Sequence, residues 1–321
     1  MACGASEIRH ELHAARDAWS AGDWLGTGER AKKTLAAAVT ARDSHGEAQA
    51  CLLLASVLSL ESRFAWARTF ATRAQALFAK HHDATGFTDS MLALSYVDGA
   101  LGDDVLSAQA AEQALAGAGR VPARGAAGLN YRGVAACWAG DYGTARGVLD
   151  AACHLAREET GSQAAAFHPL SNAVFTEVLR CATGRMARHR VDFSELGRLL
   201  YEQEQMLRAG AIGTLTGGSP DPALLLYEFA SCFAASRTGD AGLADRHYLA
   251  CLERAARLPG TSWMWSLVWW ARLERTLAAG TVHDAAASVQ RLVATAAAGE
   301  HAPMKKLAAR LAAEAQGCLH A

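Results

Sequence analysis

The stretch that decides the fold is residues 126–158, AAGLNYRGVAACWAGDYGTARGVLDAACHLARE. A Gly-Asp-Tyr turn at 140–142 separates two apolar segments that contain no proline. In the second segment Ala145, Leu149 and Ala152 recur at intervals of three and four residues, which places them on one face of a helix. Glycine suits the end of the first helix, where φ is positive, and aspartate accepts hydrogen bonds from the N–H groups that open the second. The stretch therefore predicts two antiparallel helices joined by a tight turn.

Copies of this turn recur along the chain. Gly-Asp, or a weaker version of it, marks positions 22, 62, 102, 140, 239 and 280, which are 40, 40, 38, 99 and 41 residues apart. The interval of 99 residues leaves room for one diverged copy near Gly184 and an insertion. Small or apolar residues follow other turns at the offsets seen after 140: Ala67, Ala71 and Ala74, then Ser107, Ala111 and Ala114, then Ala285, Val289 and Leu292. Small side chains at these offsets let paired helices approach closely.

The period of about 40 residues predicts one continuous array over residues 1–321. The expected units are 8–44, 46–82, 86–121, 124–159, 162–208, 222–258 and 261–298. The glycine- and proline-rich segment 208–222 is an insertion loop, which is either functional or an ordinary connection. Segment 303–319 is a leucine–alanine helix with a polar face, as the cap of a repeat array requires.

Composition supports helices. Alanine supplies 73 of the 321 residues and proline only 6. Alanine has the highest helix propensity and is depleted in strands, so the composition indicates helices and argues against an all-β fold. With 51% hydrophobic residues, the chain has ample apolar surface to offset the entropy of folding, which argues against a disordered protein. The net charge of −1 argues against a general nucleic-acid binder.

The repeat pattern resembles the tetratricopeptide repeat (TPR) family. The match is best through Leu129, Gly133, the turn at 140–142, Ala145 and Ala152, and it covers most of residues 8–300. The period near 40 exceeds the family's roughly 34 residues, and the second and fifth copies lack Gly-Asp. In its length the period is similar to the TPR arms of bacterial signalling proteins. The resemblance implies an all-α, right-handed α-solenoid of about seven antiparallel helical hairpins with a C-terminal capping helix.

The resemblance also implies a concave groove lined by the first helix of each unit. Alignment on the turns predicts these groove residues: Tyr96, Asn130, Val134, Trp138, Phe229, Phe233, Arg237, Trp270 and Glu274. The second and third units add Leu52, Ser56 and Leu92. Aromatic anchors with a few polar groups suit a binding surface. Trp263 and Trp265 fit the core and the groove equally well, whereas Trp269 fits the core.

Catalytic and metal-binding signatures are absent from the sequence. It contains no G-x-x-x-x-G-K-[ST], no H-E-x-x-H and no G-x-S-x-G. His10 and His13, and the run His81-His82-Asp83, lack partners at ligand spacing and are interpreted as surface residues. We therefore expect no catalytic residues, no metal and no cofactor. The eight cysteines are widely spaced, and neither a signal peptide nor a membrane span is evident, which predicts a cytoplasmic protein without membrane or direct nucleic-acid partners.

Three functions remain open on these observations. The first is a non-enzymatic scaffold or adaptor whose groove binds a protein or peptide segment. The second is a ligand-sensing regulatory module, for a peptide or small molecule, that acts on a separate effector in bacterial signalling or transcription control. The third is an all-helical enzyme with Asp98, Glu177 and Glu228 as inner acids. Only Asn130 and Arg237 match the basic and amide positions of the family's carboxylate clamps, which favours an apolar ligand over a strongly charged tail.

Overall fold

The computed structural model describes residues 2–118, 124–186, 191–214 and 218–319, and within them all regular structure is helical. The first eight helices are α1 (Ala2–Ser20), α2 (Trp24–Ala41), α3 (Ser44–Leu60), α4 (Phe64–Lys80), α5 (Ala84–Leu101), α6 (Asp104–Ala118), α7 (Gly125–Trp138) and α8 (Tyr142–Thr160). A short 3-10 helix, Gln163–Ala166, and seven more α-helices follow: α9 (Phe167–Met186), α10 (Ser194–Arg208), α11 (Asp221–Thr238), α12 (Ala241–Ala255), α13 (Trp265–Ala278), α14 (Val282–Ala298) and α15 (Ala302–Leu319). Successive helices from α1 to α14 pack as hairpins, so the chain is an all-α solenoid.

The turns between paired helices have the predicted conformation. Residues 22, 62, 102, 140, 239 and 280 all have positive φ, between 59° and 86°. Asp141 follows one of these turns, and its carboxylate accepts the Thr144 N–H at 3.1 Å, as expected for an N-cap. The turn expected near Gly184 is an exception, because that glycine lies inside the last turn of α9.

Small residues hold the paired helices close together. The residues predicted at the three sets of offsets after positions 62, 102 and 280 are all buried. On α7 a Cβ atom added to Gly133 would lie 2.6 Å from the Leu149 Cγ of α8. Because real Cβ atoms do not approach that closely, alanine at 133 would push the two helices apart. The alanine and glycine content is thus a packing requirement as well as a matter of helix propensity.

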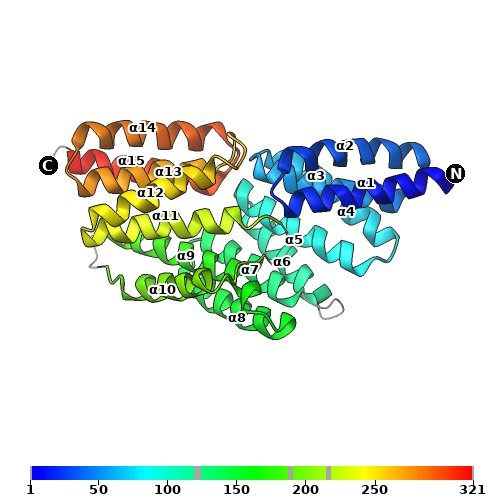
Figure 1. The fold of residues 1–321 in the computed structure, drawn as a ribbon, viewed down its shortest axis with the longest axis horizontal. Coiled ribbons are helices and arrows are strands. Elements are labelled where there is room, and N and C mark those ends of the chain that lie inside the picture. The colour runs from blue at the N-terminus through cyan, green and yellow to red at the C-terminus, as the bar shows by residue number, and fades with distance from the viewer. Residues whose placement is uncertain (1, 119–123, 187–190, 215–217, 320–321) are drawn as a thin grey trace.

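The array curls until its two ends touch. Figure 1 shows the blue N-terminal hairpins beside the orange and red C-terminal helices, with α7, α8 and α9 on the opposite side. The indole N–H of Trp24 donates to the backbone oxygen of Arg257 at 3.2 Å. The backbone N–H of Trp263 donates to Ser62 Oγ at 2.6 Å. The curled solenoid therefore encloses its inner face instead of leaving it as an open groove.

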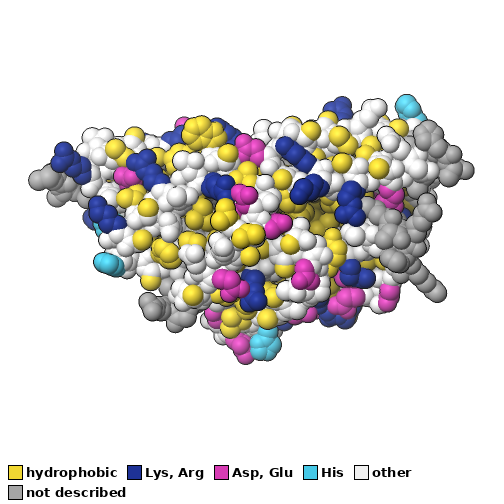
Figure 2. Space-filling view, turned by 180° about the vertical axis from the view of Figure 1, so that it is seen from behind, with side chains coloured by type: hydrophobic (Ala, Val, Ile, Leu, Met, Phe, Trp, Pro, Cys, Tyr) yellow, Lys and Arg dark blue, Asp and Glu magenta, His cyan; other side chains and the backbone are white. Residues whose placement is uncertain are grey.

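The final helix, α15, packs on α14 and also reaches α5 near the N-terminal end of the array. His301 caps it, since its Nδ1 accepts the Met304 N–H at 3.2 Å. On the face seen in Figure 2, acidic and basic side chains are interspersed, and hydrophobic side chains show between them. None of the helices in the described ranges is long and apolar enough to cross a membrane.

Candidate functional site

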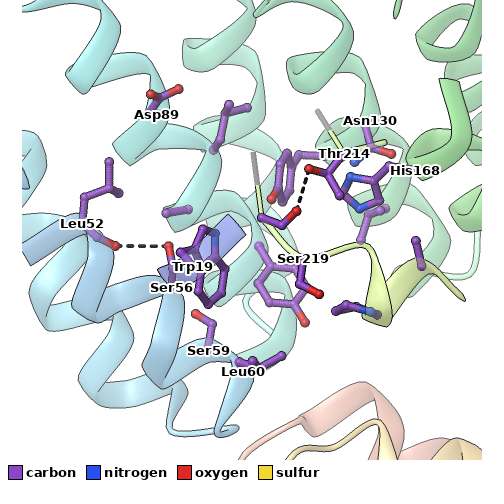
Figure 3. A pocket seen from close by; sticks show the side chains of 18 of the residues that line it. Trp19, Leu52, Ser56, Ser59, Leu60, Asp89, Asn130, His168, Thr214 and Ser219 are labelled. Atoms are coloured by element: carbon purple, nitrogen blue, oxygen red, sulfur yellow. Dashed lines mark hydrogen bonds between the residues drawn. The ribbon is translucent and has the colours of Figure 1, made fainter. Parts of the chain in front are cut away.

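The inner face encloses a cavity of about 640 Å³. Helices α1, α3, α5, α7, α9 and α11 line it, together with the described parts of the 208–222 loop and the turn that precedes α13 (Figure 3). Small-molecule sites in proteins span roughly 300–1,000 Å³, so the cavity has the size of a ligand site.

Four of the predicted groove residues line this cavity: Tyr96, Asn130, Val134 and Trp138. The three residues expected from the second and third units, Leu52, Ser56 and Leu92, line it as well. Alignment on the turns thus places these side chains on the inner face. Their part in binding stays a prediction.

The other five predicted residues lie elsewhere, and their placement in the groove is corrected: Phe229, Phe233, Arg237, Trp270 and Glu274. Helix α11 packs directly against both α9 and α13, and this packing buries Phe229 and Phe233 of α11 and Trp270 and Glu274 of α13. The rings of Phe229 and Trp270 are 4.9 Å apart between centroids, and both side chains are fully buried. Glu274 forms an ion pair with Arg237 and accepts the indole N–H of Trp270.

The cavity has two chemically different ends. The first helices α3, α5, α7 and α9 run in one direction, so residues early in these four helices gather at the same end. We call this the polar end; its residues are Gln49, Asp89, Arg124, Asn130, His168 and Asn172. Figure 3 shows Asp89, Asn130 and His168 across the cavity from Ser59 and Leu60, which stand late in α3.

At the polar end two amide side chains are bonded to each other. Asn172 Nδ2 donates to Asn130 Oδ1 at 2.8 Å. Neither side chain has another partner among the described residues, so the amino group of Asn130 and the carbonyl of Asn172 keep unused hydrogen-bonding capacity. Close by, the guanidinium of Arg124 binds the Asp89 carboxylate in a bidentate pair at 2.6 and 3.1 Å.

His168 adds a neutral imidazole to the polar end. Burial lowers its pKa to about 4, so it carries no charge near pH 7. Its Nδ1 is buried without a partner among the described residues. The charged residues that line the cavity are Arg16, Asp83, Asp89 and Arg124, so two positive charges face two negative ones. This balance suits a neutral or zwitterionic ligand.

The opposite end, which we call the aromatic end, consists of Tyr96, Trp138, Phe175 and Trp263. Ring centroids lie 5.5 Å apart for Trp138 and Phe175, and 5.9 Å apart for Trp138 and Trp263, both in edge-to-face geometry. The indole N–H of Trp263 donates to the Tyr96 hydroxyl oxygen at 3.0 Å. Burial raises the pKa of Tyr96 to about 12, so its hydroxyl keeps its proton.

His301 supports the aromatic end from outside the cavity. Its ring centroid is 4.4 Å from that of Trp263 and 4.8 Å from that of Trp138. Burial lowers the pKa of His301 to about 3, which keeps the ring neutral and compatible with its apolar surroundings. The C-terminal end of the array thus fixes one wall of the cavity.

The insertion loop borders the cavity where it faces α1. Thr214 and Ser219 line the cavity (Figure 3), and the Thr214 hydroxyl donates to the Gly218 carbonyl at 3.0 Å. Gly218 lies against the Trp19 indole, since a Cβ atom there would be 2.8 Å from Trp19 Nε1. Residues 215–217 of the loop, like residues 119–123 at the end of the third expected unit, lie outside the described residues.

Several lining residues escaped the sequence prediction: Arg16, Trp19, His168, Asn172 and Phe175. The last three share one face of α9, at the spacing by which Asn130, Val134 and Cys137 share a face of α7. That periodicity was visible in the sequence, but the fifth unit lacks the Gly-Asp turn that fixed the alignment of the others. Trp263, which fitted both core and groove, belongs to the cavity lining.

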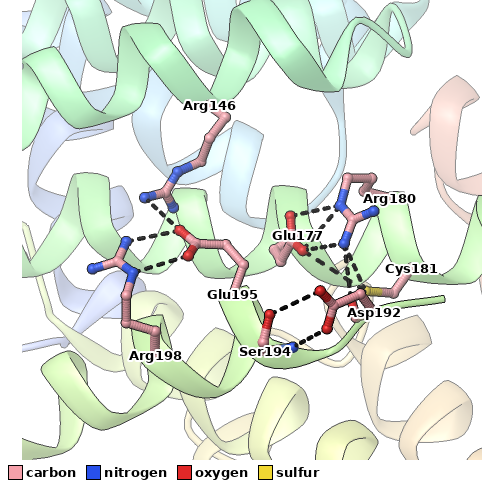
Figure 4. Close-up of polar contacts among 8 residues, drawn as sticks. All are labelled: Arg146, Glu177, Arg180, Cys181, Asp192, Ser194, Glu195 and Arg198. Carbon is pink, nitrogen blue, oxygen red and sulfur yellow. Dashed lines mark hydrogen bonds and ion pairs between the residues drawn. The ribbon is translucent and has the colours of Figure 1, made fainter.

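The three candidate acids of an all-helical enzyme do not converge. Asp98 pairs with Arg68 at 2.7 Å, and Glu228 pairs with His247 at 2.7 Å. Glu177 is bound by Arg180 in the network of Figure 4, where Arg146 and Arg198 in turn hold Glu195. None of the three acids lines the cavity. These three acids therefore do not form a pair of facing catalytic carboxylates in the cavity.

The histidines that the sequence analysis considered as metal ligands were His10, His13, His81 and His82. Among the residues that the structure describes, no three histidine, cysteine or acidic side chains are placed to hold a metal ion. His13 pairs with Asp17 on the exposed face of α1, and His81 bonds to Ser44 at the surface.

Comparison with known proteins identifies the type of fold. No family model matches the chain, and no curated protein matches it in sequence. Among solved structures the chain is similar to a Rap protein complexed with competence and sporulation factor. The TM-score is 0.62 at 12% sequence identity, with 98% of this chain and 76% of the other covered. At this identity the similarity shows the fold, which is a TPR-like helical-repeat solenoid.

Proposed function

We propose that this chain is a regulatory TPR-like protein that binds a short peptide in its enclosed cavity. The observation that carries the proposal is the bonded pair Asn130 and Asn172, which faces a cavity of ligand size with hydrogen-bonding capacity to spare. Each amide offers a donor and an acceptor, the two groups that an extended peptide backbone presents in alternation.

The charge of the lining also favours a peptide. Arg16, which is exposed on α1 at the cavity, has no partner among the described residues, and it is free to bind a terminal carboxylate. Asp83 is the lining carboxylate that Arg124 does not neutralise, and its negative charge balances an amino terminus. A zwitterionic peptide of a few residues meets both requirements.

Enclosure favours the ligand-sensing function over the scaffold function. Because the two ends of the array touch, a chain segment that belongs to a large folded partner has less access to the inner face than a short free ligand has. The complex of the similar Rap protein with competence and sporulation factor supports a regulatory ligand for this fold. We therefore propose that the protein senses its ligand and acts on a separate effector, without catalysis of its own. The six described cysteines are all free thiols, which supports a cytoplasmic location.

The proposal is tested with a library of free peptides of four to seven residues, screened by thermal shift and confirmed by calorimetry. Asn172→Leu keeps the approximate side-chain size but removes both polar groups, so we expect affinity for any peptide hit to fall about tenfold or more. Gln109→Leu, an exposed amide on α6, is the matched control and should bind like the wild type. A library without hits, or equal affinity of Asn172→Leu and wild type, contradicts the proposal.

A further inference from the structure

The aromatic end holds a hydrogen-bond donor, the Tyr96 hydroxyl, for which the described part of the chain offers no acceptor. The Tyr96 hydroxyl accepts the indole N–H of Trp263 at 3.0 Å, and no described residue accepts the hydroxyl proton in return. Tyr96 lines the cavity, and its phenol stays protonated because burial raises its pKa to about 12. A donor without an acceptor inside a cavity costs free energy, and a ligand atom that accepts its hydrogen bond removes this cost.

Around this donor the lining is aromatic and uncharged. Among the charged lining residues, Asp83 and Arg124 stand just before the first turns of α5 and α7, and Asp89 lies in the second turn of α5, seven residues before Tyr96. The rings of Trp138, Phe175 and Trp263 meet one another at tilted or edge-to-face angles. Such an arrangement presents both ring faces and ring edges to a guest ring.

We propose, on the basis of the peptide-binding function, that the aromatic end is a specificity pocket for one side chain of the peptide. That side chain is a bulky aromatic one that carries a hydrogen-bond acceptor, and tyrosine fits best. The ring of that side chain packs among Trp138, Phe175 and Trp263, while its oxygen accepts a hydrogen bond from the Tyr96 hydroxyl. The peptide backbone then extends toward Asn130 and Asn172 at the polar end.

The pocket is pre-organised by contacts that belong to both ends of the array. Trp263 is fixed through its backbone N–H by Ser62, and His301 packs against both tryptophans from behind. Rigid walls lower the entropic cost of binding and sharpen selection by shape. A flexible aliphatic chain fills the same volume but leaves the Tyr96 donor unpaired, so the donor selects against it.

Single-residue probes test the pocket without knowledge of the full ligand. The full-length chain is titrated with N-acetyl-tyrosinamide, N-acetyl-phenylalaninamide and N-acetyl-alaninamide, and binding is measured by ligand-observed NMR and by tryptophan fluorescence. We expect the tyrosine probe to bind about tenfold more tightly than the phenylalanine probe, and the alanine probe to show no saturable binding. Tyr96→Phe keeps the ring and removes the donor, so the tyrosine and phenylalanine probes should then bind equally.

A blocking variant shows where the probes bind. Val134 lies on α7 one turn from Asn130 and one turn from Trp138, and its side chain lines the cavity, so Val134→Phe places extra bulk there. We expect it to abolish binding of the tyrosine probe. Val105→Phe on the exposed surface of α6 is the matched control and should leave binding unchanged.

Three results overturn the inference: equal binding of the tyrosine and alanine probes, tyrosine binding that survives Val134→Phe, or tighter binding of N-octanoyl-glycinamide than of the tyrosine probe. Failure of the peptide function looks different. In that case no library peptide binds, although the tyrosine probe still binds in a manner that Val134→Phe abolishes. Conversely, peptide hits that depend on Asn172 but show no preference for a tyrosine or other aromatic residue leave the function intact and refute the pocket.

Discussion

The inner face of this solenoid differs sharply between its N-terminal and C-terminal parts. On α3 and α5 the inner positions carry Leu52, Ser56 and Tyr96, and a cavity lies beside them. On α11 and α13 the equivalent positions carry Phe229 and Trp270, and no space remains. The same turn-based alignment assigned both sets to a groove. The backbone pattern of a repeat therefore places residues on the inner face, but the bulk of neighbouring side chains and the curvature of the array decide whether that face stays open.

We call the inner face of α3 and α5 the open part and the region where Phe229 of α11 packs on Trp270 of α13 the closed part. The first prediction removes a large side chain from the closed part. Trp270→Ala removes a fully buried indole that packs on Phe229 and donates to Glu274, so we expect a loss of about 4 kcal/mol in the free energy of unfolding. Trp66→Ala, at a side chain that is 56% exposed on α4, should cost less than about 1 kcal/mol. Urea unfolding of both variants measures the difference. Equal losses would show that the closed part is not densely packed.

The second prediction concerns the ion pair that lies in the closed part. Arg237→Ala removes the guanidinium that pairs with Glu274, a carboxylate at 1% exposure, and we expect a loss of about 3 kcal/mol. The matched surface pair is Arg30 with Glu11 at 3.1 Å, where Arg30→Ala should cost about 1 kcal/mol or less. Thermal and urea unfolding at low and high salt check both values. A strong salt dependence of the Arg237 effect would contradict burial of the pair.

The sequence predicted local structure better than long-range contacts. All six turn positions have positive φ; five of them are glycine, which adopts this conformation readily, and the sixth is Ser62. The lining residues of α5 and α7 followed from helical periodicity after those turns. By contrast, Trp263 and His301 reach the cavity wall only because the array curls until its ends meet, and no local pattern encodes that contact. Phe229 and Trp270 were misplaced for the same reason.

The third prediction tests the contact between the ends through pH. Burial holds the His301 pKa at about 3, against about 6.5 in the unfolded chain, so the unfolded state takes up the proton first as the pH falls. The stabilising effect of a neutral His301 is present above pH 6.5 and is lost as the pH falls from 6.5 toward 3. Between pH 7.5 and 4.5 we expect this residue to account for about 2 kcal/mol of lost stability.

His301→Asn isolates that contribution. Asparagine retains an oxygen that can cap α15 but cannot titrate, so the loss of stability between pH 7.5 and 4.5 should shrink by about 2 kcal/mol relative to wild type. His168, whose pKa is lowered to about 4, acts in the same direction and remains in both proteins. His154→Asn, at an exposed position on α8, is the control. An unchanged pH dependence in His301→Asn would mean that His301 is not buried between the ends.

The smallest predicted effect differs in sign between the two parts. In the closed part the hydroxyl of Ser266 on α13 is buried and has no partner among the residues that the structure describes, whereas in the open part Ser56 Oγ donates to the Leu52 carbonyl at 3.2 Å. Ser266→Ala removes an unsatisfied polar group and should raise the free energy of unfolding by up to about 1 kcal/mol. Ser56→Ala removes a satisfied one at the cavity wall and should lower it by about 0.5 kcal/mol or less. Measured by urea unfolding in parallel, opposite signs would confirm that polar groups are tolerated beside the cavity but penalised where the inner face is closed. Destabilisation by Ser266→Ala would instead place a buried partner at that hydroxyl.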